Sequence, residues 1–232
     1  MLVREAGPGE IAVYMTRRSG QSRFVPDAYV FPGGAVDVAD NSDRLHARLI
    51  GKNIRPAREF AAAALRELFE EAGVLIAADP DGAPARFRTE QLSALRAELA
   101  GGADFAELLT REDLSLDARD LVYYSNWITP PSEPLRFDVH FFLAPAPHGQ
   151  IASADAVEVH DGRWFTPREA LERADRDELT VIFPTRKHLE RLAEYSSLEA
   201  LFAHARRREP RAIMPYQRDN GEFDLGAGSE AW

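Results

Sequence analysis

The segment that most constrains this chain is residues 66–74, with the sequence RELFEEAGV. Residues 57–72 are rich in Ala, Leu, Glu and Arg, which are good helix formers, and Gly73 is a natural left-handed stop. Pro56 suits the first turn of a helix, where the missing N–H of proline costs nothing. The segment therefore predicts a helix over residues 57–72.

The predicted helix has an apolar face and an acidic face. At about 100° per residue its apolar side chains form one stripe, which comprises Ala61, Ala64, Leu65, Leu68 and Ala72. Three carboxylates at i, i+3 and i+4 lie within about 100° of arc, opposite or beside that stripe: Glu67, Glu70 and Glu71. We expect one face to pack against the protein and the other to present the three carboxylates together.

A cluster of carboxylates is unfavourable unless a positive charge accompanies it. Like charges at i,i+4 repel by roughly 0.2–0.5 kcal/mol, and the helix dipole disfavours anions near the C-terminus. A divalent cation removes both penalties, and Mg²⁺ prefers oxygen ligands. The chain has no Cys and only 6 His, which argues against a soft-metal site.

A solvated Glu-rich face is the alternative interpretation of this helix. Two neighbours favour a site instead. Arg66 can pair with a carboxylate and hold the cluster, and the turn Phe31-Pro32-Gly33-Gly34 can bring its backbone close to a metal or a phosphate. The sequence therefore predicts a hard-cation site for diphosphate chemistry.

These residues resemble the signature of the Nudix hydrolases, G-x5-E-x7-R-E-U-x-E-E-x-G-U, in which U is apolar. Gly34 stands at the opening glycine, and Asp40 replaces the first Glu. The second half matches at every defined position, with Arg66, Glu67, Leu68, Glu70, Glu71, Gly73 and Val74. Between the halves lie 25 residues, 41–65, so about 18 are inserted. The resemblance is to the branch of coenzyme A-type diphosphatases, in which such an insertion is known.

A second motif resembles the same branch, L-L-T-x-R-[SA]-x3-R-x3-G-x3-F-P-G-G. Thr16, Arg18, Ser19 and Arg23 fall at its spacing, whereas Asp27 replaces its isolated glycine and Tyr-Met replaces the Leu pair. The resemblance implies that Arg18 and Arg23 bind substrate. The alternative is that both belong to a solvated strand end.

The resemblance also implies roles for the acidic cluster. Glu67, Glu70 and Glu71, with the backbone near Gly33 and Gly34, would hold Mg²⁺ or Mn²⁺ as the cofactor, and Arg66, Glu67 and Glu70 would be catalytic. Water would attack one phosphorus of a small-molecule diphosphate and expel a phosphomonoester. For coenzyme A, the products would be 3′,5′-ADP and phosphopantetheine.

The family often uses a further acid outside the signature. The segment 158–165 resembles its acid-then-Trp segment, so we expect Glu158 to be the general base. Asp155 and Asp161 are the alternatives, and geometry must decide between them.

Basic residues in the insertion form a second candidate substrate surface. Residues 44–58 contain Arg44, Arg48, Lys52, Arg55 and Arg58. Such a patch in an acidic protein can steer a polyanion toward the carboxylates, and we expect Arg48 and Lys52 to bind substrate. Arg136 is a further candidate for binding substrate. The alternatives are a solvated lid for the insertion and a solvent-facing strand side for Arg136.

The element pattern predicts an α/β (α+β) fold, the Nudix fold, with a mixed sheet between helices. Strands are expected at 1–3, 11–16, 29–31, 74–77, 121–128, 135–143 and 157–165, and helices at 57–72, 89–100, 167–175 and 185–206, the last broken near Ser196-Ser197. In the strand 135–143 one face is apolar throughout, with Leu135, Phe137, Val139, Phe141 and Leu143. A hairpin turn is expected at Asn220-Gly221.

We expect a single domain over residues 1–232, with an inserted helical segment at about 41–58. A helical excursion is expected at about 80–120, and a C-terminal helical extension and tail at about 184–232. The net charge of −10 argues against a nucleic acid polymer as partner. No apolar run approaches the roughly 20 residues of a membrane span, and the start of the chain lacks the apolar region of a signal peptide. We expect a cytoplasmic monomer or homodimer.

Two classes of function remain open at this point. The first is a hydrolase, acting on coenzyme A derivatives or on another substrate such as ADP-ribose, NADH or a dinucleotide polyphosphate. The second is a Nudix-fold domain that binds nucleotides without activity. Degenerate domains usually lose the carboxylates of the signature, and this chain keeps all three on the helix, which favours the enzyme.

Overall fold

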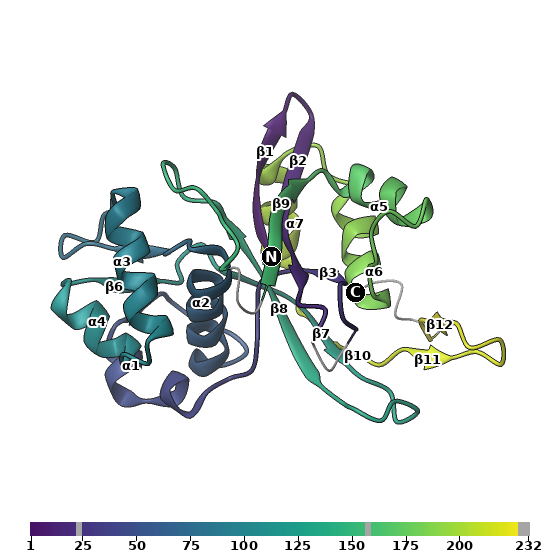
Figure 1. Cartoon of the computed structure of the whole chain (residues 1–232), viewed down its shortest axis with the longest axis horizontal. Helices are drawn as coiled ribbons and strands as arrows, with labels where there is room; N and C mark the ends of the chain where they lie inside the picture. Colours follow the sequence, from purple (N-terminus) through teal and green to yellow (C-terminus); the bar gives the residue numbers. More distant parts are fainter. Residues whose placement is uncertain (22–24, 156–158, 227–232) are drawn as a thin grey trace.

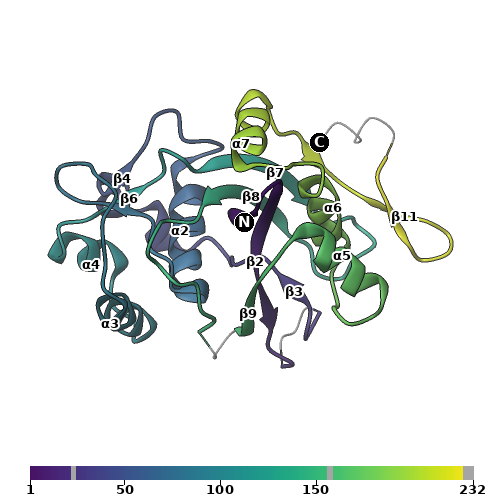
Figure 2. The ribbon, with the colours of Figure 1, turned by 90° about the horizontal axis from the view of Figure 1, so that it is seen from above.

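A mixed β-sheet forms the centre of the computed structural model, which describes residues 1–21, 25–155 and 159–226 (Figures 1 and 2). Its strands follow the order β10-β7-β8-β1-β2-β3, and β9 also pairs with β2. They are β1 (Leu2–Gly7), β2 (Glu10–Arg18), β3 (Tyr29–Val30), β7 (Val122–Ile128), β8 (Asp138–Pro145), β9 (Val159–Phe165) and β10 (Ala212–Ile213). The pairs β1–β8 and β10–β7 are parallel and the others antiparallel, which confirms the predicted mixed sheet.

The glycine turn owes its position to the register of β2. Val13 pairs with Val3 of β1 on one side and with Phe165 of β9 on the other. Further along β2, Thr16 pairs with β3 and with β9. Strand β3 therefore pairs with the second half of β2, beyond the residues that pair with β1. The chain leaves β3 directly into residues 31–34, so the sheet anchors the start of that turn.

Helix α2 (Arg58–Ala72) carries the acidic signature and is buried on two sides. Leu68 and Ala72 pack onto the sheet beside Leu2, Tyr14 and Ala144. On the other side lies a helical lobe, by which we mean α1 (Asp43–Ala47), α3 (Thr89–Ala100), α4 (Phe105–Arg111) and the small sheet of β4 (Leu49–Ile50), β6 (Ser115–Asp117) and β5 (Ala77–Ala78). Figure 1 shows the helices of this lobe gathered beside α2, away from the main sheet.

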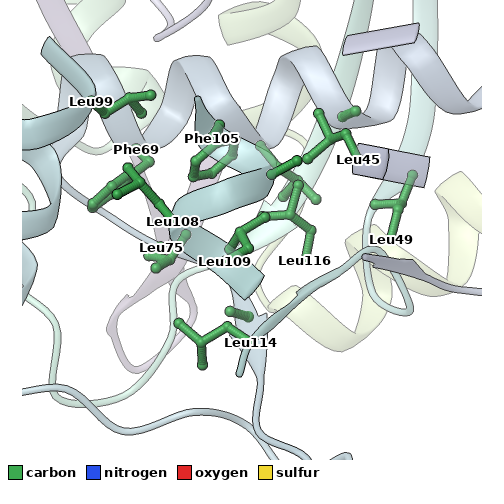
Figure 3. Close-up of a cluster of buried hydrophobic side chains, with 14 of the residues drawn as sticks. Leu45, Leu49, Phe69, Leu75, Leu99, Phe105, Leu108, Leu109, Leu114 and Leu116 are labelled. Atoms are coloured by element: carbon green, nitrogen blue, oxygen red, sulfur yellow. The ribbon is translucent and has the colours of Figure 1, made fainter. Parts of the chain in front are cut away.

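The core of the helical lobe accounts for one difference from the predicted helix faces. Phe69 is only 1% exposed although it lies outside the predicted stripe, because the lobe supplies a second apolar partner. Figure 3 shows Phe69 among leucines of the lobe and beside Phe105. The helix ends as predicted at Gly73, with φ +65°, whereas it begins at Arg58, so Pro56 precedes the N-cap residue Ala57.

The C-terminal helices lie on the opposite side of the sheet from α2 (Figure 2). They are α5 (Pro167–Asp175), α6 (Phe183–Leu192) and α7 (Leu198–Arg207). The predicted break near residues 196–197 is confirmed, because the Ser197 hydroxyl accepts a hydrogen bond from Ala200 N as the N-cap of α7. The predicted terminal turn is confirmed between β11 (Tyr216–Gln217) and β12 (Phe223–Asp224), with Gly221 at φ +86°.

The strand predicted at 135–143 is wrong in its first part. Strand β8 begins at Asp138, and the side chains of Leu135, Phe137 and Val139 are 48%, 45% and 38% exposed. The apolar face is covered only farther along, where Phe141 meets Phe31. The end of the β7–β8 hairpin extends beyond the covering helices (Figure 1). The alternating pattern alone therefore predicted burial for residues that the described helices do not cover.

Two shorter predictions also differ in detail. Residues 74–77 contribute only the beginning of β5 to the small sheet of the lobe, and the insertion contains a strand, β4, besides the helix α1. The helical excursion contains α3, at the predicted residues, and α4. Among the described residues, no helix is both long and apolar enough to cross a membrane.

Candidate active site

Arg66 is the centre of the candidate site. Its Nε and Nη2 donate to the two carboxylate oxygens of Asp40, at 2.9 and 2.8 Å. Its Nη1 donates to Glu67 at 2.9 Å and to Glu70 at 2.5 Å, and Nη2 also donates to the carbonyl of Ala35 at 3.0 Å. One guanidinium thus joins α2, the residue after the glycine turn and the residue just before the insertion.

Asp40 is completely buried, and its local structure explains how it reaches Arg66. It belongs to the short 3-10 helix η1 (Val38–Asn41), in which Asp37 N donates to Asp40 Oδ2 at 2.8 Å and Asp37 Oδ1 accepts from Ala39 N at 3.1 Å. This reciprocal cap fixes the carboxylate for a two-pronged bond to the guanidinium. Asp at this position therefore forms the ion pair with the signature arginine.

The surrounding charges outweigh the effect of burial on the pKa of Arg66. Burial by itself lowers the pKa of the Arg66 guanidinium. The hydrogen bond to Asp40 and the charges of Glu67, Asp40 and Glu70 together raise that pKa above its ordinary value. Arg66 is therefore a permanent cation that relieves the repulsion among the carboxylates.

The glycine turn contacts two positions of the acidic face, Glu71 and Glu67. Gly33 N donates to Glu71 Oε2 at 2.9 Å. A Cβ built on Gly34 would lie 2.6 Å from Glu67 Oε1, so a side chain at this position would displace the Glu67 carboxylate. Gly33 has φ +155°, which side chains rarely adopt. The two glycines thus bring the backbone of the turn against two carboxylates of α2.

The oxygen atoms that this cluster offers as ligands suit a hard cation. Glu67 and Glu71 are 9% and 8% exposed, and with Glu70 they offer only oxygen ligands. Among the described residues, no group of three acidic or histidine side chains has converged into a ready metal centre. Arg66 holds Glu67 and Glu70, and the Gly33 amide holds Glu71. Coordination would therefore exchange part of these contacts for bonds to the cation.

Of the two predicted substrate residues of the insertion, Arg48 and Lys52, the first has its partners away from the acidic cluster. Arg48 donates to Asp113 and to the carbonyl of Leu114, both at 3.4 Å, and thereby ties the insertion to the segment between α4 and β6. Lys52 is exposed in the segment between β4 and α2. The contacts of the described residues place neither side chain on the acidic cluster, so a substrate role for them stays a prediction.

The remaining predicted substrate residues are dispersed. Arg18 ends β2 and is half-buried, and Arg136 donates to the carbonyl of Thr129 at 3.0 Å near the exposed end of the β7–β8 hairpin. Arg23 and Glu158 lie outside the described residues, so their roles stay predictions.

The two alternatives to Glu158 differ in their contacts. Asp161 accepts hydrogen bonds from Arg163 Nε and from the Tyr29 hydroxyl, both at 2.7 Å. The bond from Arg163 and the bond from Tyr29 lower the pKa of Asp161 against the effect of burial. A carboxylate with such partners is a weak base. Asp155 accepts from Val159 N at 3.0 Å at the start of β9.

One residue at the site was missed by sequence reasoning. Arg96 of α3 donates from Nε to the carbonyl of Glu70 at 2.8 Å and from Nη1 to the carbonyl of Ser153 at 3.0 Å. It stands 26 residues after Glu70, and no spacing rule links the two positions. Only packing of the lobe against α2 shows this contact.

A mixed sheet, a helix that presents RE-x-x-EE-x-G and a glycine turn against its carboxylates define the class of Nudix hydrolases. The family model described as the NUDT19 Nudix domain matches residues 50–192. The chain belongs to this family, as its resemblance to the coenzyme A-type branch predicted.

Individual relatives and one crystal structure are consistent with membership in the Nudix family. The acyl-coenzyme A diphosphatase NUDT19 of Gallus gallus is 30% identical over 247 residues, covering 84% of this chain and 64% of that protein. The putative nudix hydrolase 7 of Caenorhabditis elegans is 27% identical over 203 residues, covering 88% and 63%. The chain thus spans a little under two thirds of these relatives. A NUDIX hydrolase from Alicyclobacillus acidocaldarius has a similar structure, with a TM-score of 0.78, 28% identity and coverage of 87% of this chain and 92% of that one.

Proposed function

We propose that this chain is a Mg²⁺- or Mn²⁺-dependent diphosphate hydrolase whose substrate is an acyl-coenzyme A. The observation that carries the proposal is the contact of the acidic face of α2 with the Gly33–Gly34 turn, organised by Arg66. Retention of all three signature carboxylates on the helix favours hydrolysis over binding alone. The names of the vertebrate relatives support the choice of acyl-coenzyme A among diphosphate substrates.

In the proposed reaction Glu67, Glu70 and Glu71 would hold the cation, and Arg66 keeps the carboxylates of Glu67 and Glu70 together. When bound, the cation supplies neutralisation of the diphosphate oxygens and a lower pKa for the attacking water. Gly33 N–H holds and orients Glu71. The turn brings main chain close to the phosphates because neither glycine carries a side chain.

The bond changes balance without a further reactant. The water oxygen bonds to one phosphorus, and the bond between that phosphorus and the bridging oxygen breaks. The water proton passes to a carboxylate, for which we propose Glu158, and the bridging oxygen leaves with the other phosphate. Acyl-coenzyme A then yields 3′,5′-ADP and acyl-phosphopantetheine. The absence of Cys suits the reducing cytoplasm that we propose as the location.

Mass spectrometry of the products tests this proposal. Free and acyl-coenzyme A, ADP-ribose, NADH and a diadenosine polyphosphate would each be incubated with the full chain and Mg²⁺ or Mn²⁺. We expect 3′,5′-ADP from the coenzyme A substrates. Glu71→Gln should lower kcat/KM by more than about 100-fold, because even indirect partners of a metal contribute 10–100-fold.

A matched substitution separates the site from general effects of lost charge. Glu98 lies on α3 and pairs with Arg111, so Glu98→Gln should leave the rate unchanged. Cleavage of a different substrate in the panel would reject acyl-coenzyme A and keep the chemistry. Equal rates for wild type and Glu71→Gln would reject the metal site.

A further inference from the structure

The carboxyl end of α2 is closed by three different donors. Gly73 N donates to the carbonyl of Phe69, Arg96 Nε to that of Glu70, and Ser153 N to that of Ala72, at 2.9, 2.8 and 2.9 Å. The last four carbonyls of a helix have no partners within the helix, so these contacts decide how rigid its last turn is. That turn contains two of the three signature carboxylates.

Arg96 also closes a ring of contacts with the loop before β9. Its Nη1 donates to the carbonyl of Ser153, whose own amide donates to Ala72. The side chain of Gln150 continues the attachment, since it accepts from Leu75 N at 2.9 Å and donates to Leu75 O at 2.8 Å. The loop and the end of α2 are thus joined as one unit, and Arg96 is its bridge.

The signature glycine leaves room for this bridge. A Cβ on Gly73 would lie 3.0 Å from Arg96 Nη1, and Gly73 already has φ +65°. Burial lowers the pKa of Arg96, against the opposing charges of Asp155, Tyr14 and Glu71. Its positive charge is thus felt by Glu71 while its donors fix the carbonyl of the preceding residue.

We propose that Arg96 is a positioning residue of the proposed hydrolase, which holds the last turn of α2 and the loop 150–155 in the geometry that the metal requires. This inference rests on the proposed function. Arg96 acts by bridging two carbonyls with one planar group, a task for which the single ammonium of Lys is a poor substitute. Arg96 belongs to α3, so its hydrogen bonds connect the helical lobe to the acidic cluster.

Metal affinity and hydrogen exchange test the proposal on the full chain. Arg96→Ala should weaken Mn²⁺ binding, measured by titration calorimetry or electron paramagnetic resonance, by about 10–100-fold, as for other indirect partners of a metal. Exchange of the Ser153 amide should accelerate at least about 10-fold, with no change in the strands of the main sheet. KM for substrate at saturating metal should stay within about threefold.

Two further variants make the test specific. Arg96→Lys should remain weaker than wild type in Mn²⁺ binding by about 10-fold or more, and full recovery would overturn the bridge in favour of simple charge. Arg111→Ala, in the same lobe and paired with Glu98, should match wild type. Equal losses in Arg111→Ala and Arg96→Ala, or faster exchange throughout the protein, would show a merely structural role.

The outcome is distinguishable from failure of the proposed function. If the wild type neither binds Mn²⁺ nor hydrolyses any substrate of the panel, the hydrolase proposal fails. In that case, hydrogen exchange of the Ser153 amide in wild type and in Arg96→Ala still reports whether Arg96 holds the loop. If wild type is active and Arg96→Ala binds Mn²⁺ equally well, the positioning role is wrong and the hydrolase stands.

Discussion

At the scale of single residues, the site is organised by a buried ion pair. Asp40 is fully buried and Arg66 nearly so, with the side chain of Arg66 12% exposed. Loss of Arg66 would leave the Asp40 carboxylate buried without a cation, and loss of Asp40 would leave Nε and Nη2 of Arg66 without their carboxylate partner. The pair therefore contributes to stability as well as to the arrangement of Glu67 and Glu70.

Removing Asp40 should reveal this contribution. We expect Asp40→Ala to lower the free energy of unfolding by about 3–5 kcal/mol, because it leaves the Arg66 charge buried without its main partner. Urea denaturation followed by circular dichroism would measure the change. As a control, Asp120→Ala removes an exposed partner of Arg206 and should cost less than about 1 kcal/mol. Similar losses for both variants would contradict the buried role of Asp40.

A second buried residue makes stability depend on pH. His188 is 0% exposed, lies 2.7 Å from Ser125 Oγ through Nε2 and 2.6 Å from the carbonyl of Pro184 through Nδ1. Because that carbonyl can only accept, Nδ1 carries the proton and Nε2 accepts from the serine hydroxyl. Burial lowers the pKa of His188 to about 3, despite the opposing bond to Pro184.

The sign of the pH effect follows from that lowered pKa. His188 contributes full stability above its unfolded pKa of about 6.5 and loses it as pH falls toward 3, because only the unfolded chain takes up the proton. Between pH 7 and pH 5 this should cost about 2 kcal/mol. Urea denaturation at both pH values would measure the free energy of unfolding. Between pH 7 and pH 5 this free energy should fall less for His188→Gln than for wild type. Parallel losses would contradict the prediction.

At the scale of elements, β8 shows how a covering layer decides the core. The same alternating face is buried at Leu143, which is 0% exposed, and open at Val139. We expect Leu143→Ala to lower the free energy of unfolding by about 2–5 kcal/mol and Val139→Ala by less than about 1 kcal/mol. Thermal and urea unfolding of the two variants would measure this contrast. Equal effects would mean that the end of the hairpin is covered after all.

At the scale of the whole molecule, α2 connects the main sheet to the helical lobe (Figure 1). A ligand of its acidic face that binds only the folded chain stabilises every element packed on it. We expect Mn²⁺ at about 100 times its dissociation constant to add about 2.7 kcal/mol, or roughly 5–10 °C in Tm, relative to EDTA. Differential scanning calorimetry would measure the shift. Glu71→Gln should respond much less, and an equal response would place the ion elsewhere.

Local patterns were sufficient for much of the structure and for the core of the site. The spacing of Glu67, Glu70 and Glu71 and the stop at Gly73 depend on neighbours within two helical turns, so the sequence alone predicted a helix with grouped carboxylates. The turns at Gly33-Gly34 and Asn220-Gly221 were predictable for the same reason. Glycine conformations depend on the local backbone.

Other features were decided only by the tertiary structure, because they require contacts between distant parts of the chain. Asp40 meets Arg66 across 26 residues and Arg96 meets Glu70 across another 26. Burial of Phe69 and exposure of Val139 depend on which layers cover them. The sequence by itself determined the helix, the turn and the identity of the charged groups. Long-range packing decided which charges are paired, which apolar faces are covered, and which residues hold the site in place.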